Sequence, residues 1–351
     1  MTNLTKRRAG VGASRLRWLS LGELLAEDLP VRDYLLNPLI KQSESLMLWA
    51  APGVGKTMAA LSMALAVAGG GKFLDWQAPC PRPVLYVDGE MHIEDLRDRL
   101  TVLIEAVPGL DRVAALRNLR ILARSFQEPE APFPDLGTPD GQQEIYARAR
   151  SMRAELVILD NFSVLASVDD ENDAAAMQPV LTFLLRMKQA GIATLLVHHS
   201  NKGGGDYRGS SKIATTFEAI IGLKPAAGVA SRNPTAFELD FTKYRGLRND
   251  TITQTTVWLA PDSNGVLRWQ WKESEDATLS RLVTLVRSCE YATQKDLATA
   301  MAVSTGKLSG LKSVAIARGL ISEREWQQCI EAARDQKVEF ESLAEDEDVA
   351  F

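Results

Sequence analysis

Short apolar runs along the chain predict buried strands. They lie at Ser45–Ala50, Val84–Asp88, Leu119–Ala123, Leu156–Asp160 and Ala193–His199. The run Leu156–Asp160 is apolar on both faces, which is typical of a central strand in a parallel sheet that helices cover on both sides. The pattern therefore predicts a sheet buried in the middle of the molecule.

Helical segments separate these strands along the chain. We expect helices at Met58–Ala68, from His92 to about Val107, in a polar stretch that ends near Ala154, and at Ala174–Gln189. Alternation of strand and helix is typical of an α/β fold with a mostly parallel central sheet. After Gly222 the pattern changes to short strand candidates that predict an antiparallel extension of this sheet, at Phe237–Lys243, Thr253–Leu259 and Val266–Trp271.

The chain divides into four predicted parts. Residues 1–34 form a basic arm with a short helix, residues 35–275 the α/β core, residues 276–325 a small α-rich domain and residues 326–351 an acidic tail. A length of 351 residues suits one large core with a small appendage.

Composition narrows the class of protein. No run approaches the roughly 20 apolar residues that a membrane span needs, so no membrane partner is expected. The three cysteines have no C-x-x-C spacing and the N-terminus has no apolar signal core, which favours a reducing cytoplasm. The net charge is −5, yet residues 1–17 carry five bases and no acid, while residues 323–351 carry ten acids and three bases. Because the acidic C-terminal residues carry more negative charge than the whole chain, the rest of the chain is weakly basic. A weakly basic surface permits nucleic-acid binding.

The octet AAPGVGKT at residues 50–57 joins the first strand to the following helix. A loop in this position turns backbone N–H groups towards phosphates; Lys56 reaches the β- and γ-phosphates, and Thr57 is placed to ligand Mg²⁺. Ala50 replaces the first glycine of the pattern G-x-x-x-x-G-K-[ST]. The predicted cofactors are ATP and Mg²⁺, bound by Ala51, Pro52, Gly53, Val54, Gly55, Lys56, Thr57 and Met58.

Acids at strand ends supply the other parts that phosphoryl transfer to water requires. Asp160 ends a central strand, where a carboxylate ligands Mg²⁺; the alternative is a helix N-cap. Glu90 lies just past another strand, where it can orient or deprotonate water, and Asp88 competes for that role. His198 and His199 are candidates for sensing the γ-phosphate, although either can be merely structural.

Taken in order, the motifs APGVGKT, YVDGEM, LVILDNFS, DDENDAAAM, LLVHHSNKGGGDYRGSS and FTKYRG resemble those of a known family. They are similar to the RecA-like P-loop ATPases of the plasmid RepA helicase group, which are related to the DnaB-type hexameric helicases. The resemblance runs from about Leu35 to Leu259. It implies that Lys56 and Thr57 bind phosphate and Mg²⁺, that Glu90 is the catalytic glutamate, and that Asp160 is the Walker B acid. It favours His199 as the sensor.

The same resemblance implies a homo-oligomeric ring, usually of six subunits, with ATP between neighbours. Lys243 and Arg245, in T-K-Y-R-G, match a K-x-R arrangement that supplies a cation to the adjacent subunit's nucleotide; Arg208 is the second choice for this arginine. The alternative is a solvated charge pair on an edge strand. Single-stranded DNA is expected to meet Ser200–Lys212 rather than the acidic Val168–Ala174, through Lys202, Tyr207, Arg208 and Lys212.

The region Thr278–Ser322 resembles a winged helix-turn-helix. Thr293 is the expected N-cap of its second helix, and Ser304 or Thr305 that of a recognition-like helix carrying Lys307, Lys312 and Arg318. DNA contact and protein docking are equally open uses. The terminal EDEDVAF resembles the tip of bacterial single-stranded-DNA-binding proteins, which suggests recruitment of replication proteins through Phe351; the alternative is a solvating, disordered tail.

Together these features predict an ATP-dependent, ring-forming helicase or translocase on single-stranded DNA, serving plasmid or mobile-element replication. The alternative is a regulatory, DNA-binding ATPase that switches its oligomeric state without unwinding.

Overall fold

The computed structural model describes residues 16–167, 174–199, 214–226, 235–247 and 249–347. The chain divides into two units, Met1–Asp33 and Tyr34–Phe351. The described part of the first unit contains one short helix, α1 (Leu21–Ala26), whose N-terminus is closed by a capping box between Ser20 and Glu23. None of the residues of α1 is buried.

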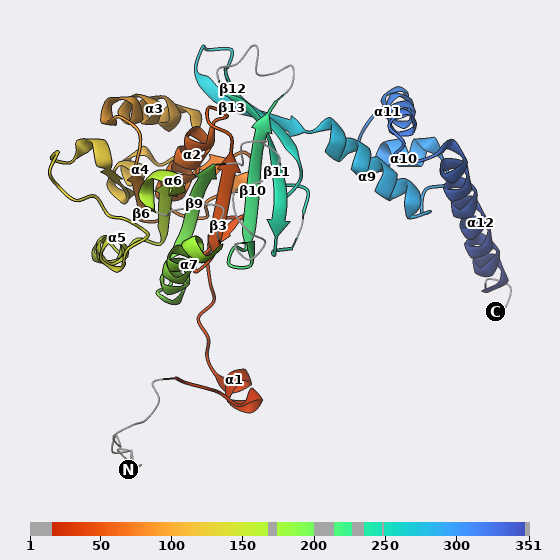
Figure 1. Ribbon diagram of the computed structural model, residues 1–351. Helices are drawn as coiled ribbons and strands as arrows, with labels where there is room; N and C mark the ends of the chain where they lie inside the picture. The colour runs from red at the N-terminus through yellow and green to blue at the C-terminus, as the bar shows by residue number, and fades with distance from the viewer. Residues whose placement is uncertain (1–15, 168–173, 200–213, 227–234, 248, 348–351) are drawn as a thin grey trace. The chain divides into compact units, whose positions relative to one another are not determined.

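A nine-stranded sheet lies at the centre of the second unit (Figure 1). Its strands follow the order β13-β12-β11-β10-β3-β9-β8-β6-β7. The last six in this order run parallel, and the first three extend the sheet antiparallel, as the sequence predicted. Their bounds are β3 (Ser45–Ala50), β6 (Val84–Asp88), β7 (Leu119–Ala123), β8 (Leu156–Asp160), β9 (Ala193–His199), β10 (Ala219–Pro225), β11 (Ala236–Tyr244), β12 (Thr255–Pro261) and β13 (Leu267–Glu273).

Helices cover both faces of the sheet. On one face lie α2 (Lys56–Gly69), α3 (Ile93–Ala106) and α4 (Arg112–Asn118); on the other lie α5 (Pro139–Ser151), α6 (Phe162–Leu165) and α7 (Ala174–Gln189). Alternate residues of β3 enter the two hydrophobic clusters: Leu46 and Leu48 join the α2 side, whereas Met47 and Trp49 join the α7 side. A strand that is buried on both faces must be apolar throughout, which explains the run from which β3 was predicted.

Strand order brings the predicted site together. The strand that precedes the P-loop, β3, lies between β9 and β10, and β9 separates it from β8, which ends in Asp160. The carboxyl ends of these parallel strands meet at one edge, where ligands bind in open α/β sheets. This is a RecA-like P-loop core, as the motifs predicted.

One parallel strand was missed. The sequence pattern appeared to change at Gly222, yet β10 continues through this residue and pairs with β3 in parallel. A Cβ atom at position 222 would lie 2.6 Å from the indole ring of Trp49. The glycine therefore leaves space for a neighbouring ring and does not mark a turn.

Shorter elements complete the second unit around the sheet. Helix α4, which was also not predicted, packs beside α2. Two small hairpins pair β1 (Tyr34–Leu36) with β2 (Ile40–Lys41), and β4 (Lys72–Phe73) with β5 (Trp76–Gln77); a 3₁₀ turn, η1, spans Arg124–Phe126. Among the described residues, no helix combines the length and apolar character needed to cross a membrane.

The C-terminal region has a hydrophobic core of its own, formed by four helices. They are α9 (Glu275–Arg287), α10 (Gln294–Ala300), α11 (Thr305–Ala317) and α12 (Glu323–Glu347). Thr293 and Ser304 cap α10 and α11 with their side chains, as predicted. Between residues 318 and 347 the structure has no strand in the place of a wing; α12 follows instead.

The expected boundary at residue 325 falls inside α12. Trp326 and Ile330 are buried in the helical core, so this part of the chain is not an acidic tail. Charged residues dominate the composition after residue 322 and conceal the apolar positions Trp326, Ile330 and Ala333, which recur at helical spacing. Phe351 lies outside the described residues.

Candidate active site

The phosphate-binding loop connects β3 to α2. Gly53 and Gly55 have φ angles of 79° and 120°, a region that glycine adopts without strain. A Cβ atom at Gly55 would also come within 3.1 Å of Thr235 and 3.2 Å of Phe237. Ala50 is the last residue of β3 and pairs with His199 and Leu223. A strand position does not need glycine, which explains why alanine is tolerated there.

Helix α2 begins at Lys56 without a side-chain cap on its N-terminus. Its first N–H groups and the positive end of its dipole therefore suit a phosphate group. The Lys56 Nζ donates to the carbonyl oxygens of Ala50, at 2.9 Å, and Ala51, at 3.0 Å, and lies 3.2 Å from Nδ1 of His199. Burial lowers the pKa of Lys56, while Asp160 and Glu90 oppose this shift.

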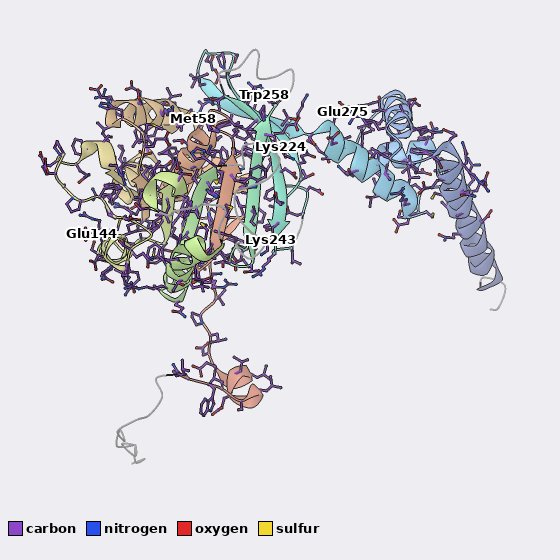
Figure 2. All side chains as sticks on the ribbon, viewed as in Figure 1. Met58, Glu144, Lys224, Lys243, Trp258 and Glu275 are labelled. Carbon is purple, nitrogen blue, oxygen red and sulfur yellow. The ribbon has the colours of Figure 1, made fainter. Side chains whose placement is uncertain are left out.

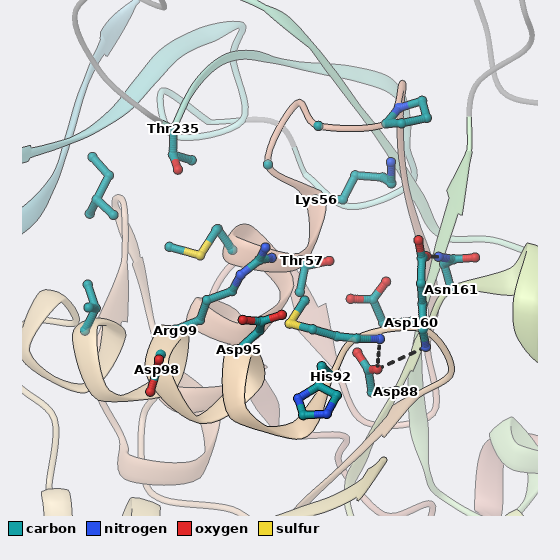
Figure 3. A pocket seen from close by; sticks show the side chains of 18 of the residues that line it. Lys56, Thr57, Asp88, His92, Asp95, Asp98, Arg99, Asp160, Asn161 and Thr235 are labelled. Carbon is teal, nitrogen blue, oxygen red and sulfur yellow. Dashed lines mark hydrogen bonds between the residues drawn. The ribbon is translucent and has the colours of Figure 1, made fainter. Parts of the chain in front are cut away.

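Asp160 lies at the end of β8, 3% exposed. Tyr86 donates to its Oδ2 at 2.6 Å from the neighbouring strand β6. The side chain of Thr57 lies beside the same carboxylate (Figure 3). Burial raises the pKa of Asp160, whereas Tyr86, Thr57 and Lys56 lower it. Thr57 and Asp160, the two predicted metal ligands, are thus neighbours in the pocket.

Asp88 and Glu90 have different environments although both follow β6. The Asp88 Oδ1 accepts from the backbone N–H groups of Glu90, at 3.1 Å, and Met91, at 2.7 Å (Figure 3). Burial is the main reason that the pKa of Asp88 rises to about 6. Glu90 is exposed, and Nδ2 of Asn161 donates to its Oε2 at 2.5 Å. Asp88 therefore fixes the turn, and Glu90 remains accessible to a substrate.

The two histidines at the end of β9 also differ. His198 is fully buried and its ring meets Phe162 edge-to-face, with centroids 5.0 Å apart. His199 is only partly buried and contacts Lys56. His199, the favoured sensor candidate, therefore lies at the phosphate-binding loop.

These side chains line a pocket of about 760 Å³. Lys56, Thr57, Glu90, Asp160 and His199 all border it. It continues along α3 past Asp95 and Arg99, and is bordered further out by apolar residues of α3, β12 and β13 (Figure 3). The apolar side chains are Val102, Leu259 and Leu267.

Sequence reasoning missed three polar residues of the site: Tyr86, Arg99 and Asn161. Tyr86 looked like one more residue of an apolar strand, and its link to Asp160 depends on the pairing of β6 with β8. Arg99 was one charge among many on an amphipathic helix. Asn161 follows Asp160 directly, and its position in the motif was the one signal that pointed to it.

Lys243 and Arg245 lie away from this pocket, at the opposite ends of the strands. Tyr244 pairs with Ala219, whereas Leu223 of the same strand pairs with Ala50 beside the phosphate-binding loop. At about 3.3 Å per residue, Ala219 and Leu223 are roughly 13 Å apart along β10. Figure 2 labels Lys224 of β10 and Lys243 of β11 at opposite ends of the strand pair. Lys243 donates to the carbonyl oxygen of Ala214 at 2.5 Å.

The predicted DNA-binding residues Lys202, Tyr207, Arg208 and Lys212 lie outside the described residues, as does most of Val168–Ala174. In the helical domain, two of the three cations assigned to a recognition helix form ion pairs within the domain. Lys312 lies 2.8 Å from Glu323, and Arg318 lies 2.6 Å from Asp276 and 2.9 Å from Glu275. Lys307 is exposed.

This chain is similar to a solved structure and to a protein family. A solved structure, a KaiC-like protein from the hyperthermophilic archaeon Pyrococcus horikoshii OT3, is similar with a TM-score of 0.46 and 16% identity, over 67% of this chain and 93% of that one. No curated protein matches. Residues 12–205, more than half of the chain, match the family described as an AAA domain. The protein therefore belongs to the AAA domain family of P-loop ATPases.

Proposed function

We propose that this protein is a Mg²⁺-dependent ATP hydrolase that assembles as a ring, typically of six subunits, and moves along single-stranded DNA as a helicase or translocase. The observation that carries the proposal is the convergence of Lys56, Thr57, Glu90 and Asp160 on one pocket. The motif resemblance motivates the DNA substrate and the role in plasmid or mobile-element replication.

The donors at the pocket fit a magnesium ion. Mg²⁺ prefers carboxylate and hydroxyl oxygens, and Thr57 and Asp160 border the same pocket side by side. Thr57 would hold the ion directly and Asp160 would hold it directly or through water. A bound Mg²⁺ would neutralise charge on the phosphate oxygens. Tyr86 keeps the Asp160 carboxylate oriented through its 2.6 Å hydrogen bond.

Lys56 binds the phosphates of ATP in this mechanism. Its ammonium group exchanges the carbonyl oxygens of Ala50 and Ala51 for phosphate oxygens, which carry more negative charge. His199 contacts the same ammonium group at 3.2 Å, so a change at the phosphates reaches the end of β9. The segment 200–213 follows immediately, which supports a connection between nucleotide state and the predicted DNA-binding loop.

Glu90 is the general base of the proposed reaction and takes a proton from the attacking water. The alternative base, Asp88, already accepts two backbone hydrogen bonds through one oxygen and is 2% exposed. Asn161 is a positioning residue, because its amide nitrogen holds Glu90. Its buried Oδ1 has no hydrogen-bond partner among the described residues and can accept one from the attacking water.

The positions of Lys243 and Arg245 support a second subunit as part of the site. Both are too far from the phosphate-binding loop of their own chain to act there, which agrees with action on a neighbour's nucleotide. An arginine supplied in this way stabilises the charge that develops on the transferred phosphoryl group. In its own subunit Arg245 lies 3.6 Å from Glu218 and remains about half exposed.

The alternative function, a regulatory ATPase that grips duplex DNA through α11, has less support. Lys312 and Arg318 are already paired with acids, so only Lys307 among the three predicted cations offers an unshielded charge. Phosphate contacts by lysine and arginine dominate the affinity for DNA.

The test is ATP hydrolysis by the wild type and by Lys56→Ala, measured without DNA, with single-stranded DNA and with duplex DNA. We expect hydrolysis that depends on Lys56 and rises with single strands alone. Strand separation would then be measured directly. Hydrolysis that depends on Lys56 but is indifferent to both DNAs would move the regulatory ATPase to first place, and Lys56-independent hydrolysis would contradict the assigned site.

A further inference from the structure

Two of the three cysteines, which lie 40 positions apart in the sequence, meet in the helical C-terminal domain. Cys289 follows the end of α9, and Cys329 lies on α12, one turn after the buried Trp326. Both thiols are partly exposed. Burial raises the pKa of Cys329, and the neighbouring thiol of Cys289 raises it further, which indicates that the two thiols lie near each other.

Hydrogen bonds on either side hold the two segments in register. Before the cysteines, Nε of Arg287 donates to Glu325 at 2.7 Å. After them, Nε of Arg334 donates to the carbonyl oxygen of Ala292 at 3.1 Å. Cys289 lies two residues after Arg287. It therefore falls opposite the middle of residues 325–334, where Cys329 lies. These two hydrogen bonds therefore place Cys289 opposite Cys329 by packing at two further points.

The backbone at Cys289 is left-handed just after α9. Its φ angle is 54°, in the left-handed region where glycine is usual just after a helix. A cysteine at such a position is held there at a conformational cost, while glycine would carry none. A metal site does not explain the pair, because the described residues contain no group of three or more His, Cys, Asp or Glu able to hold an ion.

We propose that Cys289 and Cys329 form a reversible disulfide when the protein meets a hydroperoxide. One thiol takes an oxygen atom from the hydroperoxide, which becomes an alcohol or water, and forms a sulfenic acid. The second thiol then displaces water from that sulfur to form the S–S bond. In sum, two thiols lose two electrons and two protons, and the hydroperoxide is reduced.

The bond would tie the α9–α10 turn to α12. A disulfide restricts the unfolded chain, and this one closes a loop that contains α10 and α11. Its effect is a helical domain that resists unfolding while oxidised. Cys80 is exposed and lies in the α/β part of the chain, outside the helical domain, so it serves as the internal control.

The experiment uses the full chain, treated with hydrogen peroxide, alkylated and digested with trypsin. Cleavage after arginine and lysine places Cys289 in residues 288–295 and Cys329 in residues 325–334, apart from Cys80. We expect alkylation to fall from three cysteines to one, with the two peptides linked at a mass about 2 Da below their sum. Dithiothreitol should restore alkylation, and the midpoint of thermal unfolding should rise only in the oxidised state.

The variants Cys289→Ser and Cys329→Ser should each lose the linked peptide and the shift in the unfolding midpoint. Cys80→Ser should keep both. The proposal is overturned if Cys289 and Cys329 stay alkylatable while Cys80 is oxidised. It is also overturned if either becomes a sulfinic acid without a linked peptide, or if the link joins two chains. Because the linked peptide is measured in the wild type, the result does not depend on the folding of a variant.

Discussion

At the scale of single residues, Asp88 and Glu90 follow the same strand but have different hydrogen-bond partners. The sequence left the choice between them open, because both acids follow the same strand. Hydrogen bonding separates them: Asp88 accepts two backbone N–H groups in the turn, whereas Glu90 is exposed and is contacted by Asn161. The proposal that Glu90 is the general base therefore rests on this geometry.

Glu90→Gln should reduce the turnover number for ATP by about 10²–10⁴-fold and leave ATP affinity nearly unchanged, because the amide can still hydrogen-bond but cannot take a proton. Steady-state hydrolysis together with binding of a fluorescent ATP analogue checks this. Asp88→Asn is the matched control, since its amide oxygen can still accept the two backbone hydrogen bonds. A larger loss of turnover in Asp88→Asn than in Glu90→Gln would reverse the assignment.

Asp88 also predicts a pH dependence of stability. Burial raises its pKa from 3.8 to about 6, so between these pH values the folded protein holds a proton that the unfolded chain has released. The contribution of Asp88 to stability therefore falls as pH rises from about 4 to about 6. Asp88→Asn has no proton to lose at this position, so its stability lacks this fall. The free energy of unfolding of the variant minus that of the wild type should therefore be larger at pH 7 than at pH 4, by roughly 1–3 kcal/mol.

Urea unfolding at the two pH values, without nucleotide or Mg²⁺, measures this difference. Comparison of variant with wild type cancels the contributions of acids far from Asp88, whereas the interaction of Asp88 with Asp160 and Glu90 is part of the measured difference. A difference that stays constant with pH would show that Asp88 does not titrate as described.

The sequence predicted the acids and the phosphate-binding loop because strand ends and glycines leave local signals. Tyr86 leaves none and Asn161 only its place directly after Asp160, because their roles arise from the pairing of β6 with β8 and from the turn after β8. Residues that hold other residues in place are visible only once the strands are in register.

At the scale of elements, local pattern was sufficient for β3, β6, β7, β8 and β9, which have the predicted bounds. It failed where tertiary contacts decide. Gly222 interrupts the apolar pattern of β10 only because Trp49 needs the space. Helix α12 was obscured by its charges, although Trp326 and Ile330 are buried.

The position of α12 predicts a strong effect of Trp326→Ala. The indole is 1% exposed and packs in the helical core, so its loss should destabilise the C-terminal domain by about 3–5 kcal/mol. Thermal unfolding followed by circular dichroism measures this. A chain that ends after residue 336 is the control, because it keeps Trp326, Ile330 and Ala333, and should lose far less stability. Equal losses in the two variants would contradict the packing of α12.

At the scale of the whole molecule, the phosphate-binding loop and the pair Lys243–Arg245 mark opposite edges of one sheet. The proposed site is complete only between two subunits. Arg245→Ala and Lys56→Ala should each abolish ATP hydrolysis alone, whereas a mixture of the two should regain activity.

In randomly mixed rings of equal proportions, about a quarter of the interfaces combine an intact Lys56 with an intact Arg245 from the neighbour, so roughly that share of activity should return. Hydrolysis measured across mixing ratios checks this, with the double variant added to the wild type as a control. Absence of recovery in mixtures that have exchanged subunits would contradict the role of Arg245 in trans.

Because the phosphate-binding loop and the Lys243–Arg245 pair lie at opposite ends of the sheet, the number of complete sites depends on whether the ring is closed. Contact between a loop on one subunit and cations on the next is head-to-tail, so a row of subunits that does not close has one fewer complete site than it has chains. Closure supplies the missing site, and an isolated chain has none. Activity per chain should therefore rise steeply with protein concentration and fall on dilution, so that the last subunit to join contributes two sites at once.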